Sequence, residues 1–188
     1  VDDARRVADR LEIPYYVMNF KQEFKKNVMD YFTAEYLKGR TPNPCIACNR
    51  YVKWESLLKR CLDIGADYIA TGHYAERVYD YKTNRYILKR PKDRSKDQTY
   101  VLYGLTQYQL SKTLFPLGEY EKSDIRRIAE AAGLINSRKP DSQDICFVPD
   151  GDYASFIKKN TGAEIKEGNF ISADGDVIGR HKGIINYT

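Results

Sequence analysis

Two cysteines, Cys45 and Cys48, form a C-x-x-C pair within residues 41–54, which read TPNPCIACNRYVKW. Basic residues follow the pair directly, and fixed positive charge favours the thiolate form of a nearby thiol. Because Pro42 and Pro44 exclude a regular helix through themselves, we expect this segment to be a shaped loop. A thiolate can act as a nucleophile or bind a metal ion, whereas an inert pair or an adventitious disulfide is the alternative that the residues leave open.

A third thiol, Cys146, lies far along the chain in residues 137–148, which read SRKPDSQDICFV. Its surroundings are polar and partly cationic, as they are for the C-x-x-C pair. The remaining cysteine, Cys61, falls on the apolar stripe of an expected helix over 52–62, so we expect it to be a small buried hydrophobic residue.

Between residues 82 and 96 the chain has a local charge excess of +6, compared with +5 for all 188 residues. Its basic residues are Lys82, Arg85, Lys89, Arg90, Lys92, Arg94 and Lys96, and its acidic residue is Asp93. Tyr79, Tyr81 and Tyr86 lie among them, which suits contact with a phosphate backbone and stacking on bases. The alternative is a solvated, charged hairpin.

The composition is that of a chain with a real core, because 42% of the residues are hydrophobic. No apolar run approaches the roughly 20 residues that span a bilayer, and the first residues are charged and helix-like, so we expect no membrane segment and no signal peptide. Few and unevenly spaced cysteines favour a reducing cytoplasm. The motifs G-x-x-x-x-G-K-[ST], G-x-G-x-x-G and H-E-x-x-H are absent.

The apolar pattern predicts helices over 1–11, 22–37 and 52–62, and buried strands over 13–20 and 66–71. Strand, helix and strand in alternation predict an α/β fold with a parallel sheet. In such sheets ligands lie beyond the carboxyl ends of the strands, where Gly72 would allow close approach of a ligand to the backbone. We expect the next residue, His73, to be structural.

The second half of the chain predicts smaller elements. Residues 75–81 and 86–90 alternate as a hairpin, and Asp97 is a plausible N-cap of the apolar stretch that follows. Short helices should begin near Tyr108, among them one capped by Ser123, and a second hairpin should cover 169–178. We therefore expect three domains, over 1–107, 108–165 and 166–188.

Taken together and in order, six motifs closely resemble the bacterial tRNA-specific 2-thiouridylases. They are TPNPCIACNRYVKW, DYIATGHYA, KDQTYVLYGL, LFPLGEYEKSDIRRIAEAAGL, SQDICFV and GRHKG. The resemblance covers nearly the whole chain. It implies a truncated α/β PP-loop ATP-pyrophosphatase domain, of the adenine nucleotide alpha hydrolase-like type, then a small helical central domain and the start of a β-barrel domain.

The resemblance also implies roles for individual residues. Cys48 matches the nucleophile, Cys146 matches the cysteine that carries sulfur as a persulfide, and Gly72 matches a nucleotide contact. Residues that surround the target base are matched by Asn43, Pro44 and Cys45. Residues that contact tRNA are matched by Lys96, Asp97 and Gln98, to which the basic segment would add Lys89, Arg90 and Lys92.

The chemistry implied is replacement of O2 of the wobble uridine of tRNA by sulfur. ATP with Mg²⁺ would adenylate O2, the Cys146 persulfide would deliver sulfur to C2, and Cys48 would release it through a disulfide or as hydrosulfide. The implied partners are tRNA and a persulfide donor, either a cysteine desulfurase or a relay protein, in the cytoplasm.

The chain departs from the family pattern at two places. Many relatives have aspartate in place of Cys45, and three thiolates from Cys45, Cys48 and Cys146 could instead hold a [4Fe–4S] cluster with one open iron. A structural zinc site is a weaker possibility. The S-G-G-x-D-S phosphate loop does not occur in these residues, so we expect the 188 residues alone to be an inactive fragment.

Two other functions remain open. Another PP-loop enzyme, such as an amide-forming ligase, also adenylates an oxygen but has no need of paired thiols. A non-catalytic RNA-binding module with a structural metal would unfold when that metal is removed.

Overall fold

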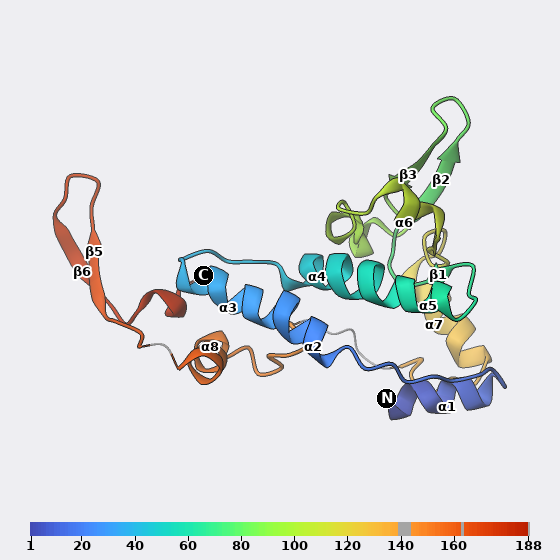
Figure 1. Ribbon diagram of the computed structural model, residues 1–188, viewed down its shortest axis with the longest axis horizontal. Coiled ribbons are helices and arrows are strands. Elements are labelled where there is room, and N and C mark those ends of the chain that lie inside the picture. Colours follow the sequence, from blue (N-terminus) through green and yellow to red (C-terminus); the bar gives the residue numbers. More distant parts are fainter. Residues whose placement is uncertain (139–143, 163, 188) are drawn as a thin grey trace. The chain divides into compact units, whose positions relative to one another are not determined.

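The computed structural model describes residues 1–138, 144–162 and 164–187 (Figure 1). Its α-helices are α1 (Asp2–Arg10), α2 (Lys21–Phe24), α3 (Asp30–Leu37), α4 (Pro44–Ala47), α5 (Leu58–Asp63), α6 (Gln107–Ser111), α7 (Lys122–Ala131) and α8 (Tyr153–Thr161). Wider π-helical segments are η1 (Lys25–Met29) and η2 (Cys48–Leu57), and 3-10 turns are η3 (Arg94–Lys96), η4 (Thr99–Val101) and η5 (Ile184–Asn186). Its strands are β1 (Ile69–Ala70), β2 (Glu76–Asp80), β3 (Arg85–Lys89), β4 (Thr113–Leu114), β5 (Gly168–Ile171) and β6 (Val177–His181).

The chain forms two compact units. Unit 1 comprises Val1–Lys21 and Asn49–Asp141, and unit 2 comprises Gln22–Cys48 and Ser142–Thr188. Both units combine segments that are far apart in the sequence. The three domains expected over 1–107, 108–165 and 166–188 remain a prediction.

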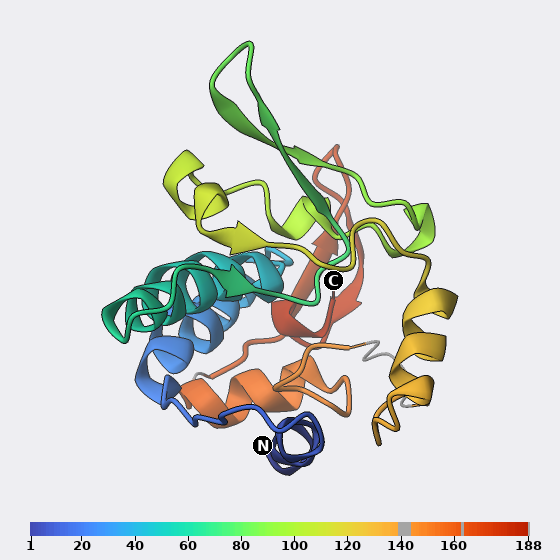
Figure 2. The ribbon, with the colours of Figure 1, turned by 90° about the vertical axis from the view of Figure 1, so that its right-hand side faces the viewer.

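The parallel pairing in unit 1 joins β1 to β4, with Ile69 opposite Thr113 and Ala70 opposite Leu114 (Figure 2). This confirms α/β character with parallel strands. The strand over 66–71 is present in shortened form, and its partner is a segment for which we expected helix. Residues 113–114 escape a pattern search because two residues are too few to show a period of two.

The strand predicted over 13–20 is wrong. This segment is irregular, and Ile13, Tyr16 and Val17 are each more than half exposed. Apolar composition alone cannot make a strand, because strand backbone groups need a neighbouring strand to bond with.

A continuous helical run from α4 through η2 to α5 crosses from unit 2 into unit 1. Within unit 1, Trp54 is buried and its Nε1 donates to Thr113 Oγ1 over 2.7 Å, which secures this helix to β4. The run ends before Gly65, whose φ of +91° lies in the left-handed region that glycine favours. The helix predicted over 52–62 is confirmed, and Cys61 is partly buried on it.

The basic hairpin of unit 1 is confirmed as antiparallel β2 and β3, with Tyr79 opposite Tyr86 (Figure 1). Two predictions of helix N-caps, at Ser123 and at Asp97, need correction. Glu121, not Ser123, is the N-cap of α7, where it forms a capping box with Asp124. Asp97 does cap the backbone N–H of Thr99, but only a 3-10 turn follows.

Unit 2 is built on the helical run α2–η1–α3, the helix predicted over 22–37. Its core consists of Phe32, Tyr36, Ile157 and Ile185, which come from α3, α8 and η5. The antiparallel hairpin β5–β6 confirms the prediction for 169–178. Among the described residues, no helix combines the length and apolar character needed to cross a membrane.

Candidate functional site

The C-x-x-C pair lies in the first turns of a helix, so the prediction of a loop through this segment is wrong. Asn43 is the N-cap, its Oδ1 accepting from the N–H of Cys45 over 3.0 Å, and Pro44 is the first helical residue. Proline is tolerated there because that position needs no N–H donor, and its φ already suits a helix. Cys45 is exposed and Cys48 is partly exposed, so both thiols are accessible at the start of a rigid element.

The residue after Cys48 secures the same helix within unit 1. Asn49 is 2% exposed, and its Nδ2 donates to the carbonyl of Val101 over 3.0 Å. Its Oδ1 is buried with no hydrogen-bond partner among the described residues. Asn49 therefore ties the start of η2 to the turn η4, which closely follows the predicted tRNA-contacting residues.

Cys146 lies in an exposed turn of unit 2. The residues on either side of it, Ile145 and Phe147, pack against the core of that unit. The ring of Phe147 lies 5.7 Å from that of Phe24 and 5.4 Å from that of Phe32, both edge-on. The turn thus buries its apolar neighbours and leaves the thiol at the surface.

One helical run supports both thiol-bearing segments. Phe24 and Phe32 flank η1 and hold Phe147, while α4 packs against η1 itself. All three candidate thiols fall in unit 2, which ends its first segment at Cys48. The structure thus brings Cys45, Cys48 and Cys146 into one compact body, although they are far apart in the sequence.

The structure contains neither a disulfide nor a metal-binding group at these thiols, within the part of the chain that it describes. All four cysteines are outside any disulfide, so a resting disulfide is not supported. Within the described part of the chain, no group of three or more His, Cys, Asp or Glu side chains is gathered to hold a metal ion. The geometry therefore does not fit a cluster held by Cys45, Cys48 and Cys146.

Gly72 is exposed just beyond the carboxyl end of β1. A Cβ at this position would meet only Leu117 Cδ1, at an ordinary 3.8 Å, so the fold itself does not require glycine here. The neighbouring His73 is buried, and burial together with the charge of Lys53 lowers its pKa to about 4. Its Nδ1 lies 2.9 Å from Thr71 Oγ1, which fits the structural role that we expected.

Two of the residues predicted to contact tRNA use their side chains within unit 1. Gln98 Oε1 accepts from the N–H of Tyr74 over 2.9 Å, and Asp97 Oδ2 accepts from Arg90 Nε over 2.7 Å. Although burial opposes it, hydrogen bonds from Thr99 and Arg90 lower the pKa of Asp97. This segment is thereby fastened both to the backbone beside Gly72 and to the basic hairpin.

The basic residues of the segment from 82 to 96 are exposed, except for the partly buried Lys96. On the opposite face of the hairpin, the ring of Tyr79 lies 4.9 Å from that of Tyr86, over which the Arg77 guanidinium stacks at 4.8 Å. Tyr81 is 84% exposed beside them. Cations and an accessible aromatic ring therefore share one projecting element.

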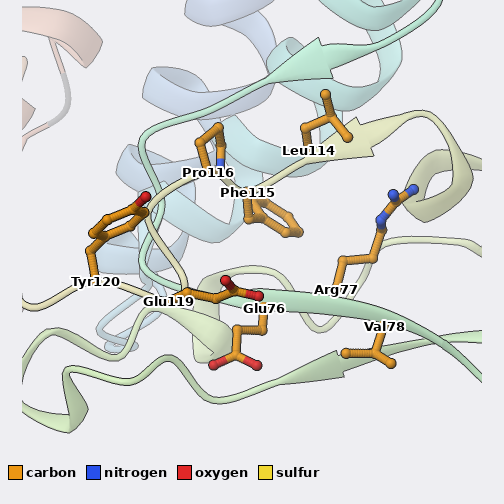
Figure 3. Close-up of a pocket in the computed structure, with 8 residues that line it drawn as sticks. All are labelled: Glu76, Arg77, Val78, Leu114, Phe115, Pro116, Glu119 and Tyr120. Atoms are coloured by element: carbon orange, nitrogen blue, oxygen red, sulfur yellow. The ribbon is translucent and has the colours of Figure 1, made fainter.

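A pocket of about 430 Å³ lies between β2 and the segment after β4, also in unit 1. Figure 3 shows its lining residues, among them Glu76 on β2 and Phe115 and Glu119 on the segment after β4. None of the candidate site residues named from the sequence lines this pocket. Five of its lining residues, Leu114, Phe115, Pro116, Glu119 and Tyr120, fall within the motif LFPLGEYEKSDIRRIAEAAGL, but a motif in one segment does not show which other segment completes a pocket.

The comparisons with known proteins agree with the motifs. The family model of the tRNA methyl transferase HUP domain matches residues 1–150. The chain is 65% identical to the tRNA-specific 2-thiouridylase MnmA of Lachnoclostridium phytofermentans and 57% identical to that of Clostridium kluyveri. It is also 60% identical to tRNA-specific 2-thiouridylase MnmA 1 of Thermoanaerobacter pseudethanolicus.

In each of these three matches the whole of this chain aligns with 52% of the relative, so the chain spans about half the length of its curated relatives. The resemblance inferred from six short motifs is thereby confirmed over the entire sequence. This chain belongs to the tRNA methyl transferase HUP domain family, and its relatives there are tRNA-specific 2-thiouridylases.

Proposed function

We propose that the protein to which this chain corresponds makes 2-thiouridine in tRNA, with Cys146 as the sulfur carrier and Cys48 as the thiol that releases the sulfur. The observation that carries the proposal is the common support of both thiols by α2–η1–α3 in one unit. A two-thiol reaction needs such an arrangement, because one sulfur must reach the other within the same active site.

The two thiols suit different roles. Cys48 lies in the second turn of the helical run that begins at Pro44, so the helix backbone fixes the position of this residue. Cys146 lies in an exposed turn, where a donor protein can reach it. We therefore assign the fixed thiol to nucleophilic attack and the accessible thiol to sulfur loading.

The sulfur transfer proceeds in two displacements. ATP with Mg²⁺ would supply the adenylyl group: O2 of the uridine bonds to the α-phosphorus, pyrophosphate leaves, and O2 becomes part of a leaving group. The terminal sulfur of the Cys146 persulfide attacks C2, and the C2–O2 bond breaks with its electron pair leaving on AMP. Cys48 thiolate then attacks Cys146 Sγ, so that the S–S bond breaks and its electron pair forms the thiocarbonyl. The resulting Cys48–Cys146 disulfide needs a thiol reductant before the next turnover. In the alternative order, Cys48 thiolate attacks Cys146 Sγ of the persulfide first, and the hydrosulfide that is released then attacks C2.

For ATP, the fitting residue in this chain is Gly72, because its exposed backbone has no neighbour closer than Leu117 on the Cβ side. Gln98 would hold that backbone in place through its bond to Tyr74. Asn43, Pro44 and Cys45, at the start of α4, would surround the target base.

Contact with the phosphates of tRNA would come from Lys89, Arg90 and Lys92, and further contact with tRNA would come from Lys96, Asp97 and Gln98. Neutralising phosphates makes affinity fall steeply with salt. Reversing Lys89 and Lys92 to glutamate should weaken tRNA binding and reduce the salt slope, measured by filter binding across salt concentrations. The matched control reverses Lys158 and Lys159, which are exposed on α8 and outside the hairpin. Equal effects of the two double variants would contradict the assignment.

In the whole protein, residues 1–107 would be part of the PP-loop domain, 108–165 a central helical domain and 166–188 the start of a β-barrel domain. The enzyme would work in the cytoplasm with a persulfide donor, either a cysteine desulfurase or a relay protein. No step is routed through a [4Fe–4S] cluster. Anaerobic reconstitution with iron and sulfide should leave no stoichiometric iron, and iron lost on replacing Cys45 would favour a cluster.

The deciding experiment uses a chimaera in which these 188 residues replace the matching half of the Lachnoclostridium phytofermentans relative. Mass spectrometry of digested tRNA measures 2-thiouridine formed with ATP and a persulfide donor. Cys48→Ser and Cys146→Ser should each abolish the product, while Cys61→Ser should retain it. Retention of the parent rate by either of the first two variants would overturn the proposal.

A further inference from the structure

The turn that carries Cys146 is closed by a hydrogen bond between two other side chains. The hydroxyl of Tyr153 donates to Asp144 Oδ1 over 2.6 Å, joining the first residue of α8 to a residue two positions before the cysteine. The N–H of Ile145 donates to the same oxygen over 2.8 Å. The carboxylate of Asp144 thus organises the backbone directly beside Cys146.

Tyr153 is a fixed anchor for this bond because its ring belongs to the core of unit 2. The ring lies 5.8 Å from that of Phe32 and 6.1 Å from that of Tyr36, both on α3. A phenol held in this way has little freedom to move its hydroxyl. The bond therefore fixes the Cys146 turn relative to α3.

A glycine beside the Asp144 carboxylate leaves room for it. Gly151 has a φ of +68°, and a Cβ on it would lie 3.2 Å from Asp144 Oδ2. Two backbone bonds tighten the turn further, from Val148 N–H to the Ile145 carbonyl over 2.9 Å and from Gly151 N–H to the Val148 carbonyl over 3.1 Å. The cysteine is thus enclosed in a short loop tied at both ends.

The protonation states agree with this geometry. The hydrogen bond from Tyr153 lowers the pKa of Asp144, and the same bond raises the pKa of Tyr153 to about 12. At neutral pH a carboxylate acceptor therefore faces a protonated phenol, so the bond is charge-assisted.

We propose that Asp144 and Tyr153 are positioning residues for Cys146: their hydrogen bond holds the turn in the orientation from which the Cys146 sulfur reaches Cys48. This inference rests on the proposed function, since it specifies how the sulfur-carrying thiol is presented. Neither residue touches the transferred sulfur in this role. Both act through the backbone of the turn.

The test uses the 188-residue chain with Cys45 and Cys61 replaced by serine, so that only the two relevant thiols remain. Mild oxidation with diamide, followed by mass spectrometry, measures the rate of the intramolecular Cys48–Cys146 disulfide. Tyr153→Phe keeps the ring and removes the hydroxyl, and it should slow this rate by about tenfold, as expected for a misplaced reacting group. Hydrogen exchange at the Ile145 amide should quicken, while the amides of α8 keep their protection.

Tyr36→Phe is the matched control, because it removes a hydroxyl from a neighbouring ring of the same core. It should leave the rate unchanged. Asp144→Asn keeps an acceptor oxygen and should retain most of the rate, whereas Asp144→Ala should behave like Tyr153→Phe.

The outcomes separate the two proposals. A parent chain that forms no disulfide would overturn the partnership of Cys48 with Cys146, and with it the positioning role. If the parent chain forms the disulfide but Tyr153→Phe forms it at the same rate, the positioning role alone is overturned. The same conclusion follows if Tyr36→Phe slows disulfide formation as much as Tyr153→Phe does.

Discussion

The two units of this molecule differ in the contacts that stabilise each of them internally. Unit 2 has an aromatic core in which edge-on and tilted rings surround Phe32. In unit 1, buried and part-buried hydrogen bonds of side chains join segments that are far apart in the sequence. Trp54 bonds to the side chain of Thr113, and bonds to backbone groups include those of Asn49 to Val101, Gln98 to Tyr74, Gln107 to Tyr86, and Arg77 to Leu110 and Ser111.

This difference follows from the kind of segment that each unit holds in place. The parallel pairing of unit 1 is only two residues long, so its irregular segments satisfy their backbone groups with side chains. Directional bonds of this kind keep the surroundings of Gly72 in register. The rings of unit 2 instead pack against the neighbours of an exposed cysteine, and the hydrogen bond from Tyr153 to Asp144 adds a directional contact beside them.

Removing the central ring of unit 2 should give the largest effect. Phe32 is completely buried, so Phe32→Ala should destabilise unit 2 by about 3–5 kcal/mol through lost burial and a cavity. The single tryptophan, Trp54, lies in unit 1, so its fluorescence monitors that unit while near-UV circular dichroism monitors the tyrosines of both. An equal loss of stability in both signals would show that the two cores are not independent.

Acid should act on unit 1 through His73. Its folded pKa of about 4 lies below the ordinary value of 6.5, because burial and Lys53 favour the neutral ring. Unit 1 therefore keeps its full stability above pH 6.5 and loses on the order of 3 kcal/mol as the pH falls from 6.5 to 4. Urea titrations followed by Trp54 fluorescence measure this loss, and His73→Gln should flatten the dependence. A slope that survives in His73→Gln belongs to other groups.

A smaller effect on stability is expected at Asn49, near the start of η2. Asn49→Ala leaves the buried carbonyl of Val101 without its donor, which should cost about 1–3 kcal/mol. The loss should appear in the Trp54 signal. Asn49→Asp is the conservative control, and because it cannot donate, it should be at least as destabilising; a stable Asn49→Asp would disprove the importance of this bond.

The smallest effect is expected at the cap of the same helix. Asn43→Ala removes the bond to the Cys45 N–H and should cost about 1 kcal/mol. Iodoacetamide should then label Cys45 faster, because the first helical turn frays. Labelling of Cys146, whose turn is held by rings, should stay constant and serves as the internal reference.

The sequence alone predicted the elements that depend on local order. The helices over 22–37 and 52–62 and both hairpins follow from apolar periodicity, which neighbouring residues express by themselves. It also identified the family, because the spacing of the cysteine, glycine and basic motifs is written directly in the chain. The predicted strand over 13–20 was wrong because a strand depends on a partner, and the predicted loop was wrong because Pro44 can begin a helix as well as prevent one.

Only the tertiary structure decided which distant segments meet. Residues 113–114 pair with β1, Asn49 donates to the carbonyl of Val101, and Tyr153 donates to Asp144 beside Cys146. No residue pattern encodes these pairings, because each depends on the directions in which whole helices and turns leave the core. Residue types thus determined which chemistry the chain can perform, and packing determined which atoms are held in place to perform it.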